Sequence, residues 1–299
     1  MNISCVFAQF NNTTSYPITQ DGTCGVSVNR SCGNFDCCSQ DGYCGGTADG
    51  CQKDYGFCGL LNDSLKIINS CQSERTLALT FDDGPRPWTN ELLDELKKHD
   101  IKATFFFNGH NALNYCIYDY ADIVRRIYDE GHQFAHHTWS HPHMAQVTPK
   151  EVNYQIDKLE TAFIKILGVI PRFFRLPFGE GMNYDALRTN LIQRGYKFFA
   201  LWDIDTNDFL GNETIAKELF LNGISDAKPH IVLNHDRVLT TVEDLVPFNI
   251  ENAIKAGYTF DTLAGCNGMH NKTDWYKVIG ERQKNDSTWI CTPDDMHIP

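Results

Sequence analysis

A chain of 299 residues can hold one large domain and one small one, because single hydrophobic cores stop growing near about 250–300 residues. Hydrophobic residues at 42% and charged residues at 21% are ordinary proportions for a soluble globular protein. The formal net charge of -12 argues against nucleic acid as a partner, since an acidic surface cannot neutralise phosphates, and no apolar run approaches the roughly 20 residues that span a membrane.

The first quarter of the chain predicts a polar tail over residues 1–22, a cysteine-rich module over residues 23–59 and a linker over residues 60–73. The module holds seven of the 12 cysteines: Cys24, Cys32, Cys37, Cys38, Cys44, Cys51 and Cys58. Dense cysteines in a segment with little apolar content indicate a disulfide-stapled module or a metal cluster. Because paired Cys-x-x-Cys motifs are missing from this segment, we favour disulfides and therefore an oxidising compartment outside the cytosol.

Glycosylation motifs agree with an extracellular location. Eight asparagines begin an Asn-x-Ser/Thr triplet without an intervening proline: Asn2, Asn11, Asn12, Asn29, Asn62, Asn212, Asn271 and Asn285. A signal peptide is not evident, because Met1–Phe10 has no basic start and its apolar run is too short for a secretory core. We therefore expect either that the N-terminus is truncated or mis-assigned, or that export uses another route.

From Glu74 onwards, short apolar runs typical of strands alternate with amphipathic helical patterns. The runs are Thr76–Phe81, Ile101–Phe107, His132–His136, Arg172–Arg175, Lys197–Trp202, His230–His235 and Tyr258–Leu263. The clearest helix begins at Thr148, where Thr-Pro-Lys-Glu supplies an N-cap, a proline in the first turn and a capping-box Glu151, and it ends at Gly168. Such alternation predicts an α/β fold of parallel strands joined by helical crossovers. Seven units favour a barrel that lacks one strand, with an open sheet as the alternative.

Residues that can carry out chemistry follow five of these strands, where parallel β/α barrels place their functional side chains. The candidates are Asp82 and Asp83 after the first strand, His137 and His141 after the third, Arg175 and Phe178 after the fourth, Asp208 and Phe209 after the fifth, and Leu233 and His235 on the sixth. Carboxylates, imidazoles and a guanidinium are therefore expected at one rim. Two histidines four residues apart suit a single metal ion.

Each of these signals also has an ordinary structural interpretation. Adjacent acids are usually solvated turn residues, and an arginine before Leu-Pro is more often a salt-bridge partner than a catalytic group. His132 and His136 are also four apart, but they lie on the same side of their strand as Phe134, so we expect them to be packed in the core. His143 is expected at the surface. The convergence of several groups on one rim favours a shared site over these separate interpretations.

The strand-end motifs resemble the NodB-homology polysaccharide deacetylases (carbohydrate esterase family 4), which include fungal chitin deacetylases. The resemblance covers residues 74–265, and all five family motifs occur in order. The phrases Ala-Leu-Thr-Phe-Asp-Asp-Gly-Pro from Ala78 and His-Thr-Trp-Ser-His-Pro from His137 follow the family almost letter for letter. The family fold is a distorted, incomplete (β/α)7 barrel, in agreement with the seven predicted units. Residues 266–299 form a C-terminal extension, of which residues 267–299 match no known pattern.

The resemblance implies a divalent metal ion, most often Zn2+ with Co2+ as an alternative, held by Asp83, His137 and His141. Three protein ligands leave positions open for water and substrate, as a catalytic metal site requires. It further implies that Asp82 is the general base and that His235 is the general acid, which protonates the departing amine.

Other residues would assist that acid–base pair. Arg175 would hold Asp82 ionised and oriented, since a nearby cation favours the carboxylate. Asp208 would keep His235 charged. The backbone N–H of Phe178 would donate to the oxyanion of the tetrahedral intermediate.

The same resemblance assigns Phe209 and Leu233 to the pocket that receives the acetyl methyl group. The family commonly has tryptophan at the position of Phe209 and tyrosine at the position of Phe178. We expect the first departure to loosen the acetyl pocket. The second should be mild, because only the backbone of Phe178 is used.

A second resemblance lies in the cysteine-rich module. The stretch from Cys37 to Gly45, with its adjacent cysteines and Ser-Gln-x-Gly-aromatic-Cys-Gly, resembles hevein-like chitin-binding modules. Such modules bind N-acetylglucosamine through a serine and exposed aromatic side chains, here Ser39 and Tyr43. Asp41 replaces a usual aromatic residue and the segment with the sixth cysteine is deleted, so we expect weak sugar binding, with a purely structural module as the alternative.

These resemblances also imply disulfides. The implied pairs are Cys24–Cys38, Cys32–Cys44, Cys51–Cys58 and Cys71–Cys266. Cys37 loses its usual partner in the module and could pair with a scattered cysteine such as Cys5. The sequence does not decide the partners of Cys116 and Cys291.

The sequence therefore predicts a monomeric enzyme, secreted or associated with a cell wall, that hydrolyses N-acetyl groups of N-acetylglucosamine polymers. Chitin or chitooligosaccharides are the favoured substrates, and the products would be chitosan and acetate. Peptidoglycan and acetylxylan are the alternative substrates of the same machinery. A non-enzymatic alternative is an inactive glycan-binding protein, against which the complete set of metal-binding and acid–base residues argues.

Overall fold

The computed structural model describes residues 37–38, 44–45, 65–111 and 115–292. The chain divides into two compact units, residues 1–64 and residues 65–299. In the first unit, β1 (Cys37–Cys38) pairs antiparallel with β2 (Cys44–Gly45). Several predicted features lie outside the described residues: the tail over 1–22, the sugar-binding candidates Ser39 and Tyr43, and at least one cysteine of each disulfide predicted in the module.

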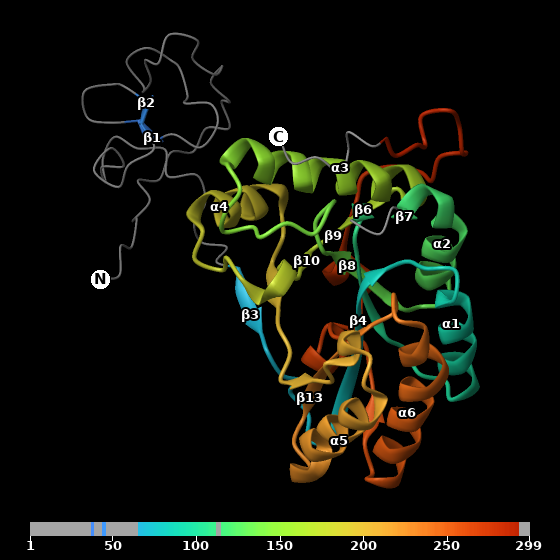
Figure 1. Ribbon diagram of the computed structural model, residues 1–299. Helices are drawn as coiled ribbons and strands as arrows, with labels where there is room; N and C mark the ends of the chain where they lie inside the picture. Colours follow the sequence, from blue (N-terminus) through green and yellow to red (C-terminus); the bar gives the residue numbers. More distant parts are fainter. Residues whose placement is uncertain (1–36, 39–43, 46–64, 112–114, 293–299) are drawn as a thin grey trace. The chain divides into compact units, whose positions relative to one another are not determined.

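The second unit is built around a curled parallel sheet of nine strands (Figure 1). Along the sheet its strands are β12 (Ile204–Asp205), β13 (His230–His235), β4 (Thr76–Gly84), β5 (Thr104–Phe107), β8 (Gln133–His136), β10 (Phe173–Phe174), β11 (Phe198–Ala200) and β3 (Lys66–Ile68), and β14 (Thr259–Phe260) pairs with the start of β4. Strands β12 and β3 are the edges of the described sheet, so the barrel is incomplete. The predicted fold class of this unit is confirmed, and each of the seven predicted runs overlaps one of these strands.

Helices cover the sheet on its outer side. They are α1 (Thr89–Lys98), α2 (Ala121–Asp129), α3 (Pro149–Leu167), α4 (Asp185–Arg194), α5 (Glu213–Gly223), α6 (Val246–Lys255) and the short α7 (Lys272–Trp275). Helix α3 begins at the predicted capping box, in which Thr148 and Glu151 exchange hydrogen bonds. It ends where Gly168 adopts a φ of 76°, a conformation that glycine reaches without steric cost.

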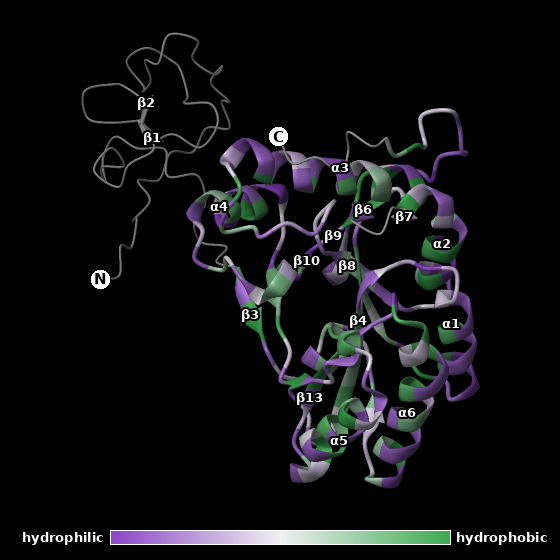
Figure 2. Cartoon of the chain, viewed as in Figure 1, coloured by the Kyte–Doolittle hydropathy of each residue, from purple (hydrophilic) through white to green (hydrophobic). Residues whose placement is uncertain are grey.

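The core lies between the central strands and these helices. Every residue of β4 is buried, because the strand has neighbours on both sides and is covered on its faces. Phenylalanines on adjacent strands stack across the sheet, with ring centroids 5.3 Å apart for Phe81 and Phe105 and 6.5 Å apart for Phe107 and Phe134. Figure 2 shows hydrophobic colouring along β4 and mixed colouring on the surrounding helices. This close packing of the central strands positions the strand ends.

Two parts of the unit were not anticipated. Strand β3 lies inside the predicted linker over residues 60–73 and pairs with β11, so the compact unit begins at Leu65 rather than at Glu74. With three residues, two of them exposed, β3 has too little pattern to be recognised in the sequence. The C-terminal extension also belongs to this unit: β15 (Tyr276–Val278) pairs with β9 (Val169–Pro171), and the Tyr276 ring stacks on Phe134 at 4.6 Å.

Two disulfides join distant parts of the same unit. The predicted Cys71–Cys266 bond is confirmed and links residues 195 positions apart. A second bond joins Cys116 to Cys291 across 175 positions and ties the C-terminal segment to β7 (Tyr115–Cys116). It assigns the two cysteines whose partners the sequence left open.

No helix among the described residues has the length and apolar character needed to cross a bilayer.

Candidate active site

The register of the parallel sheet brings the predicted strand-end residues to one rim. His235 on β13 lies opposite Asp82 on β4, and Asp82 lies opposite Phe106 on β5. On the other side of β5, Phe107 lies opposite His136, the residue before His137. The register thus places His235, the carboxylate pair Asp82–Asp83 and His137 next to one another.

Asp83, His137 and His141 form a group whose ligand atoms all lie within 4.8 Å of one another. Asp83 Oδ1 is 3.7 Å from His137 Nε2 and 3.4 Å from His141 Nε2. This oxygen is buried and has no hydrogen-bond partner in the structure, which is costly unless a cation or a water satisfies it. One carboxylate and two imidazoles are a donor set that suits a catalytic divalent metal ion. The three residues therefore fit a metal site.

The protonation of these ligands is also suitable. His137 Nδ1 donates to the carbonyl oxygen of Arg175 at 2.8 Å, which leaves Nε2 free to bind a metal ion. Burial lowers the pKa of His141 to about 4, so its ring is neutral at neutral pH. Burial alone would raise the pKa of Asp83, but the neighbouring histidines lower it overall and favour the carboxylate.

The other histidines of this region occupy the positions expected for structural residues. His132 and His136 are buried, and burial lowers the pKa of His136 to about 3. His136 stacks on Phe174 at 5.0 Å, and its Nδ1 accepts a hydrogen bond from the N–H of Thr138. His143 is half-exposed and pairs with Glu180 at 3.1 Å.

Asp82 and Arg175 form a buried ion pair beside the metal site. Arg175 Nη1 donates to Asp82 Oδ1 at 2.8 Å, and the two residues are 0% and 3% exposed, so solvent screens the pair weakly. The guanidinium also donates to Thr80 Oγ1 and to two backbone carbonyls, which fixes its orientation. Asp82 Oδ2 lies 3.6 Å from His137 Nε2. One carboxylate oxygen is thus held by arginine and the other faces the metal ligands.

On the opposite side of the carboxylates, His235 is held by Asp208. His235 Nδ1 donates to Asp208 Oδ1 at 2.7 Å, and the His235 N–H donates to Asp208 Oδ2 at 2.7 Å. Burial disfavours the charged imidazole, but the hydrogen bond and the charge of Asp208 outweigh it and raise the pKa of His235 to about 9. The structure therefore presents a protonated ring at neutral pH.

The predicted apolar residues lie around these groups. Phe209 is 44% exposed, and its ring centroid is 5.4 Å from that of His235. Leu233 is buried two residues before His235 on β13, on the same face of the strand. The Phe178 backbone has a φ of 59°, and the exposed ring lies edge-on to His141 with centroids 4.6 Å apart.

Two residues at the rim were missed by the sequence analysis. Arg237 Nε lies 2.8 Å from Asp83 Oδ2, so the second oxygen of this ligand faces a guanidinium. Thr241 donates to Asp208 Oδ2 at 2.7 Å and helps to orient the partner of His235. Both follow β13 closely in the chain, and position after a strand end is the signal that could have identified them.

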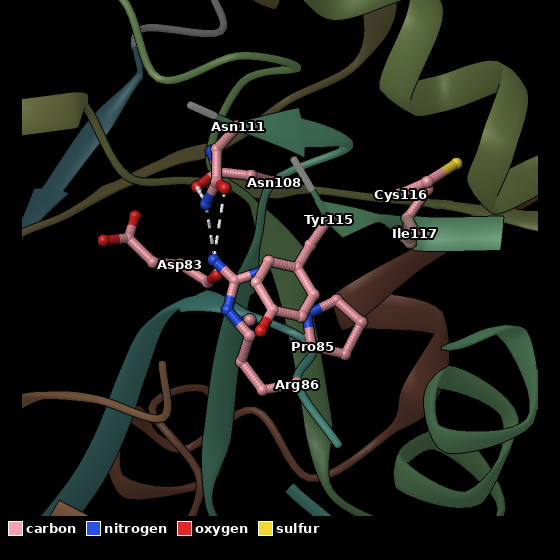
Figure 3. A pocket seen from close by; sticks show the side chains of 9 residues that line it. Asp83, Pro85, Arg86, Asn108, Asn111, Tyr115, Cys116 and Ile117 are labelled. Carbon is pink, nitrogen blue, oxygen red and sulfur yellow. Dashed lines mark hydrogen bonds between the residues drawn. The ribbon is translucent and has the colours of Figure 1, made fainter. Parts of the chain in front are cut away.

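A third missed residue, Asn108, follows β5 directly. It lines a small pocket beside Asp83 together with Arg86, Asn111 and Tyr115 (Figure 3). Arg86 Nη2 donates to Asn111 Oδ1 at 3.1 Å, and the Arg86 guanidinium lies 4.0 Å from the centre of the Tyr115 ring. The pocket has no space for a water molecule, so these polar side chains form packed support rather than a substrate site.

Comparison with known proteins agrees with the geometry. The family described as Polysaccharide deacetylase matches residues 69–199. A chitin deacetylase from Pestalotiopsis sp is 41% identical over 218 residues, which cover 72% of this chain and 70% of the relative. The chain belongs to the polysaccharide deacetylase family.

Solved members of the polysaccharide deacetylase family share the fold. The structure of the chitin deacetylase from Colletotrichum lindemuthianum superimposes with a TM-score of 0.66 at 32% identity, over 71% of this chain and 96% of that one. A peptidoglycan-N-acetylglucosamine deacetylase from Bacillus cereus is 37% identical over 164 residues, 53% of this chain and 55% of the relative. The family thus includes relatives named for two different glycan substrates.

Proposed function

We propose that this polysaccharide deacetylase removes N-acetyl groups from chitin or chitooligosaccharides in a metal-dependent hydrolysis. The observation that carries the proposal is the placement of a buried carboxylate, Asp82, and a protonated imidazole, His235, beside one group of metal ligands. Amide hydrolysis needs both a base for the attacking water and an acid for the departing nitrogen. The site offers both at one rim.

When bound by Asp83, His137 and His141, a divalent metal ion would polarise the amide carbonyl and lower the pKa of water. We propose Zn2+ as the native ion, with Co2+ as a substitute. Asp82 takes the proton from the water that attacks the acetyl carbon. Arg175 pairs with one oxygen of Asp82 and directs the other towards the ligands.

The tetrahedral intermediate then collapses with the help of two other groups. The backbone N–H of Phe178 donates to the oxyanion and offsets its negative charge. His235 gives its proton to the glucosamine nitrogen as the C–N bond breaks, and Asp208 stabilises the charged ring before that step. Phe209 and Leu233 line the pocket for the methyl group. The products are acetate and a free amine on an uncut chain.

Chitin is favoured over the alternative substrates because three relatives that are 32–41% identical over 71–72% of this chain are named chitin deacetylases. Peptidoglycan is the second candidate, because the Bacillus cereus relative is named for it. Acetate release from chitin oligomers, peptidoglycan and acetylxylan, measured side by side, tests the choice. Acetyl loss from chitin oligomers without chain cleavage supports the proposal. A response to acetylxylan or peptidoglycan alone refutes the chitin assignment.

We also propose that the protein acts as a monomer outside the cell or at a cell wall, in keeping with the two disulfides of the second unit. The cysteine-rich module would add weak affinity for chitin through Ser39 and Tyr43. Replacing Tyr43 by alanine in the full chain should reduce retention on insoluble chitin while leaving hydrolysis of short oligomers unchanged. Equal retention of the variant and the parent protein would support a purely structural module.

A further inference from the structure

Asn108 connects the backbones of both ligand-bearing segments. Its Nδ2 donates to the carbonyl oxygens of His137 at 2.6 Å and Thr138 at 3.1 Å. Its own N–H donates to the carbonyl of Gly84, the residue after Asp83, at 3.2 Å. The side chain is buried, with an exposed fraction of 3% for the residue. One residue therefore links the strand that carries Asp83 to the loop that carries both histidines.

The segments that Asn108 connects are strained. Asp83, Thr138 and His141 have φ angles of 70°, 72° and 59°, in the left-handed region. Such a conformation costs on the order of 1–3 kcal/mol per residue and persists only where the surroundings impose it. Threonine is a clear outlier there because it is branched at Cβ. The ligand geometry thus depends on contacts that hold these backbones.

The contacts around Thr138 meet this requirement. Its carbonyl accepts from Asn108, its N–H donates to His136 Nδ1 at 3.0 Å, and its Oγ1 accepts from the N–H of His141 at 3.1 Å. The residue after Asn108 adds a further link, because the N–H of Gly109 donates to the Trp139 carbonyl at 2.9 Å. The hydrogen bonds of Asn108 and Gly109 thus hold the backbone of residues 137–139.

We propose that Asn108 is a positioning residue that sets the metal affinity of this site by locking the histidine loop against the Asp83 strand. Its amide acts through the backbone carbonyls of His137 and Thr138. The inference rests on the proposed metal site. Loss of a residue that orients metal ligands without binding the ion itself typically lowers metal affinity by about 10–100-fold.

The test is Asn108→Asp, which keeps the shape but replaces two N–H donors with a carboxylate that faces two carbonyls. Zn2+ affinity is measured by equilibrium competition with a chelator, and the Tm of the metal-free protein is measured in parallel. Asn190→Asp is the matched control, because Asn190 is also 3% exposed and its Nδ2 donates to Asn153, away from the ligands. Only Asn108→Asp should lose about 10–100-fold in affinity, because the carboxylate in Asn190→Asp still accepts from Arg194 Nε, away from the ligands.

If Asn108→Asp does not fold, Asn108→Ala removes the donors without adding a charge and carries the same expectation. An unchanged Zn2+ affinity in a folded Asn108 variant with a lowered Tm would reduce Asn108 to a structural residue and overturn the inference. Failure of the parent protein to bind Zn2+ is a different result, because it refutes the proposed metal site itself.

Discussion

Asp82→Asn separates the proton-accepting role of Asp82 from its role in packing. Asparagine has the same shape, and its carbonyl oxygen can still accept from Arg175 Nη1, which lies 2.8 Å from Asp82 Oδ1. Asp83, His137 and His141 are unchanged, so the variant should still bind the metal ion. What the substitution removes is the basic oxygen that faces His137 Nε2 at 3.6 Å.

The expected loss of kcat is about 10²–10⁴-fold, the usual contribution of a positioned general base. It corresponds to roughly 2.7–5.5 kcal/mol in the activation barrier. Stability should fall as well, because Arg175 is fully buried and loses its counter-charge. Breaking a buried ion pair costs about 3–5 kcal/mol. The guanidinium keeps its bonds to Thr80 and to two carbonyls, so we expect the lower end of that range.

The assay is acetate release from a chitin oligomer at saturating substrate, with bound metal measured on the same preparation. Asp203→Asn is the control, because Asp203 also pairs with a buried cationic partner, His230, at 2.7 Å. Asp203 lies just before β12, at the opposite end of the strands from the catalytic rim. The control variant should keep its kcat. Parental activity in a metal-loaded Asp82→Asn variant would refute the base assignment, and loss of the metal ion would make Asp82 a ligand instead.

Two further perturbations follow from the same contacts. Asp208→Asn removes the charge that raises the pKa of His235, so the pKa of His235 should fall. Since the acid must be protonated to act, the alkaline limb of the pH–rate profile should then move to lower pH. An alkaline limb that does not move would exclude His235 as the acid. Replacing Cys116 and Cys291 together by serine opens a loop of 175 residues and should lower the free energy of unfolding by about 2–5 kcal/mol. The variant should show a lower Tm and the same kcat as the parent protein. An unchanged Tm would show that the bond does not constrain the chain.

The main features of the site at the carboxyl ends of the strands could be predicted, because they follow from short motifs and from the alternation of strands and helices along the chain. Parallel strands align their carboxyl ends, so residues at the ends of β4 and β13 and just after β8 meet whatever the exact length of the loops. Asp82 and His235 are an example: they are 153 positions apart in the chain and lie opposite each other in the sheet register. The capping box of α3 was equally accessible, because all its residues lie within one turn.

What the sequence did not reveal depends on tertiary contacts. Asn108 also follows a strand, but an amide that binds backbone carbonyls has no motif, since its partners are not side chains. Arg237 is close to His235 in the chain, yet its contact with Asp83 depends on the turn after β13. The Cys116–Cys291 bond depends on the path of the C-terminal segment along β9, which no local pattern encodes.

The central claim is that Asp83, His137 and His141 hold a metal ion that this polysaccharide deacetylase needs to deacetylate chitin. Its most direct test is mass spectrometry of a chitin oligomer incubated with chelator-treated protein, before and after Zn2+ is restored. Acetyl groups should be lost only after Zn2+ is added back, with the sugar chain left uncut. Equal deacetylation by the metal-free protein, or none after Zn2+ is restored to a folded sample, would contradict the claim.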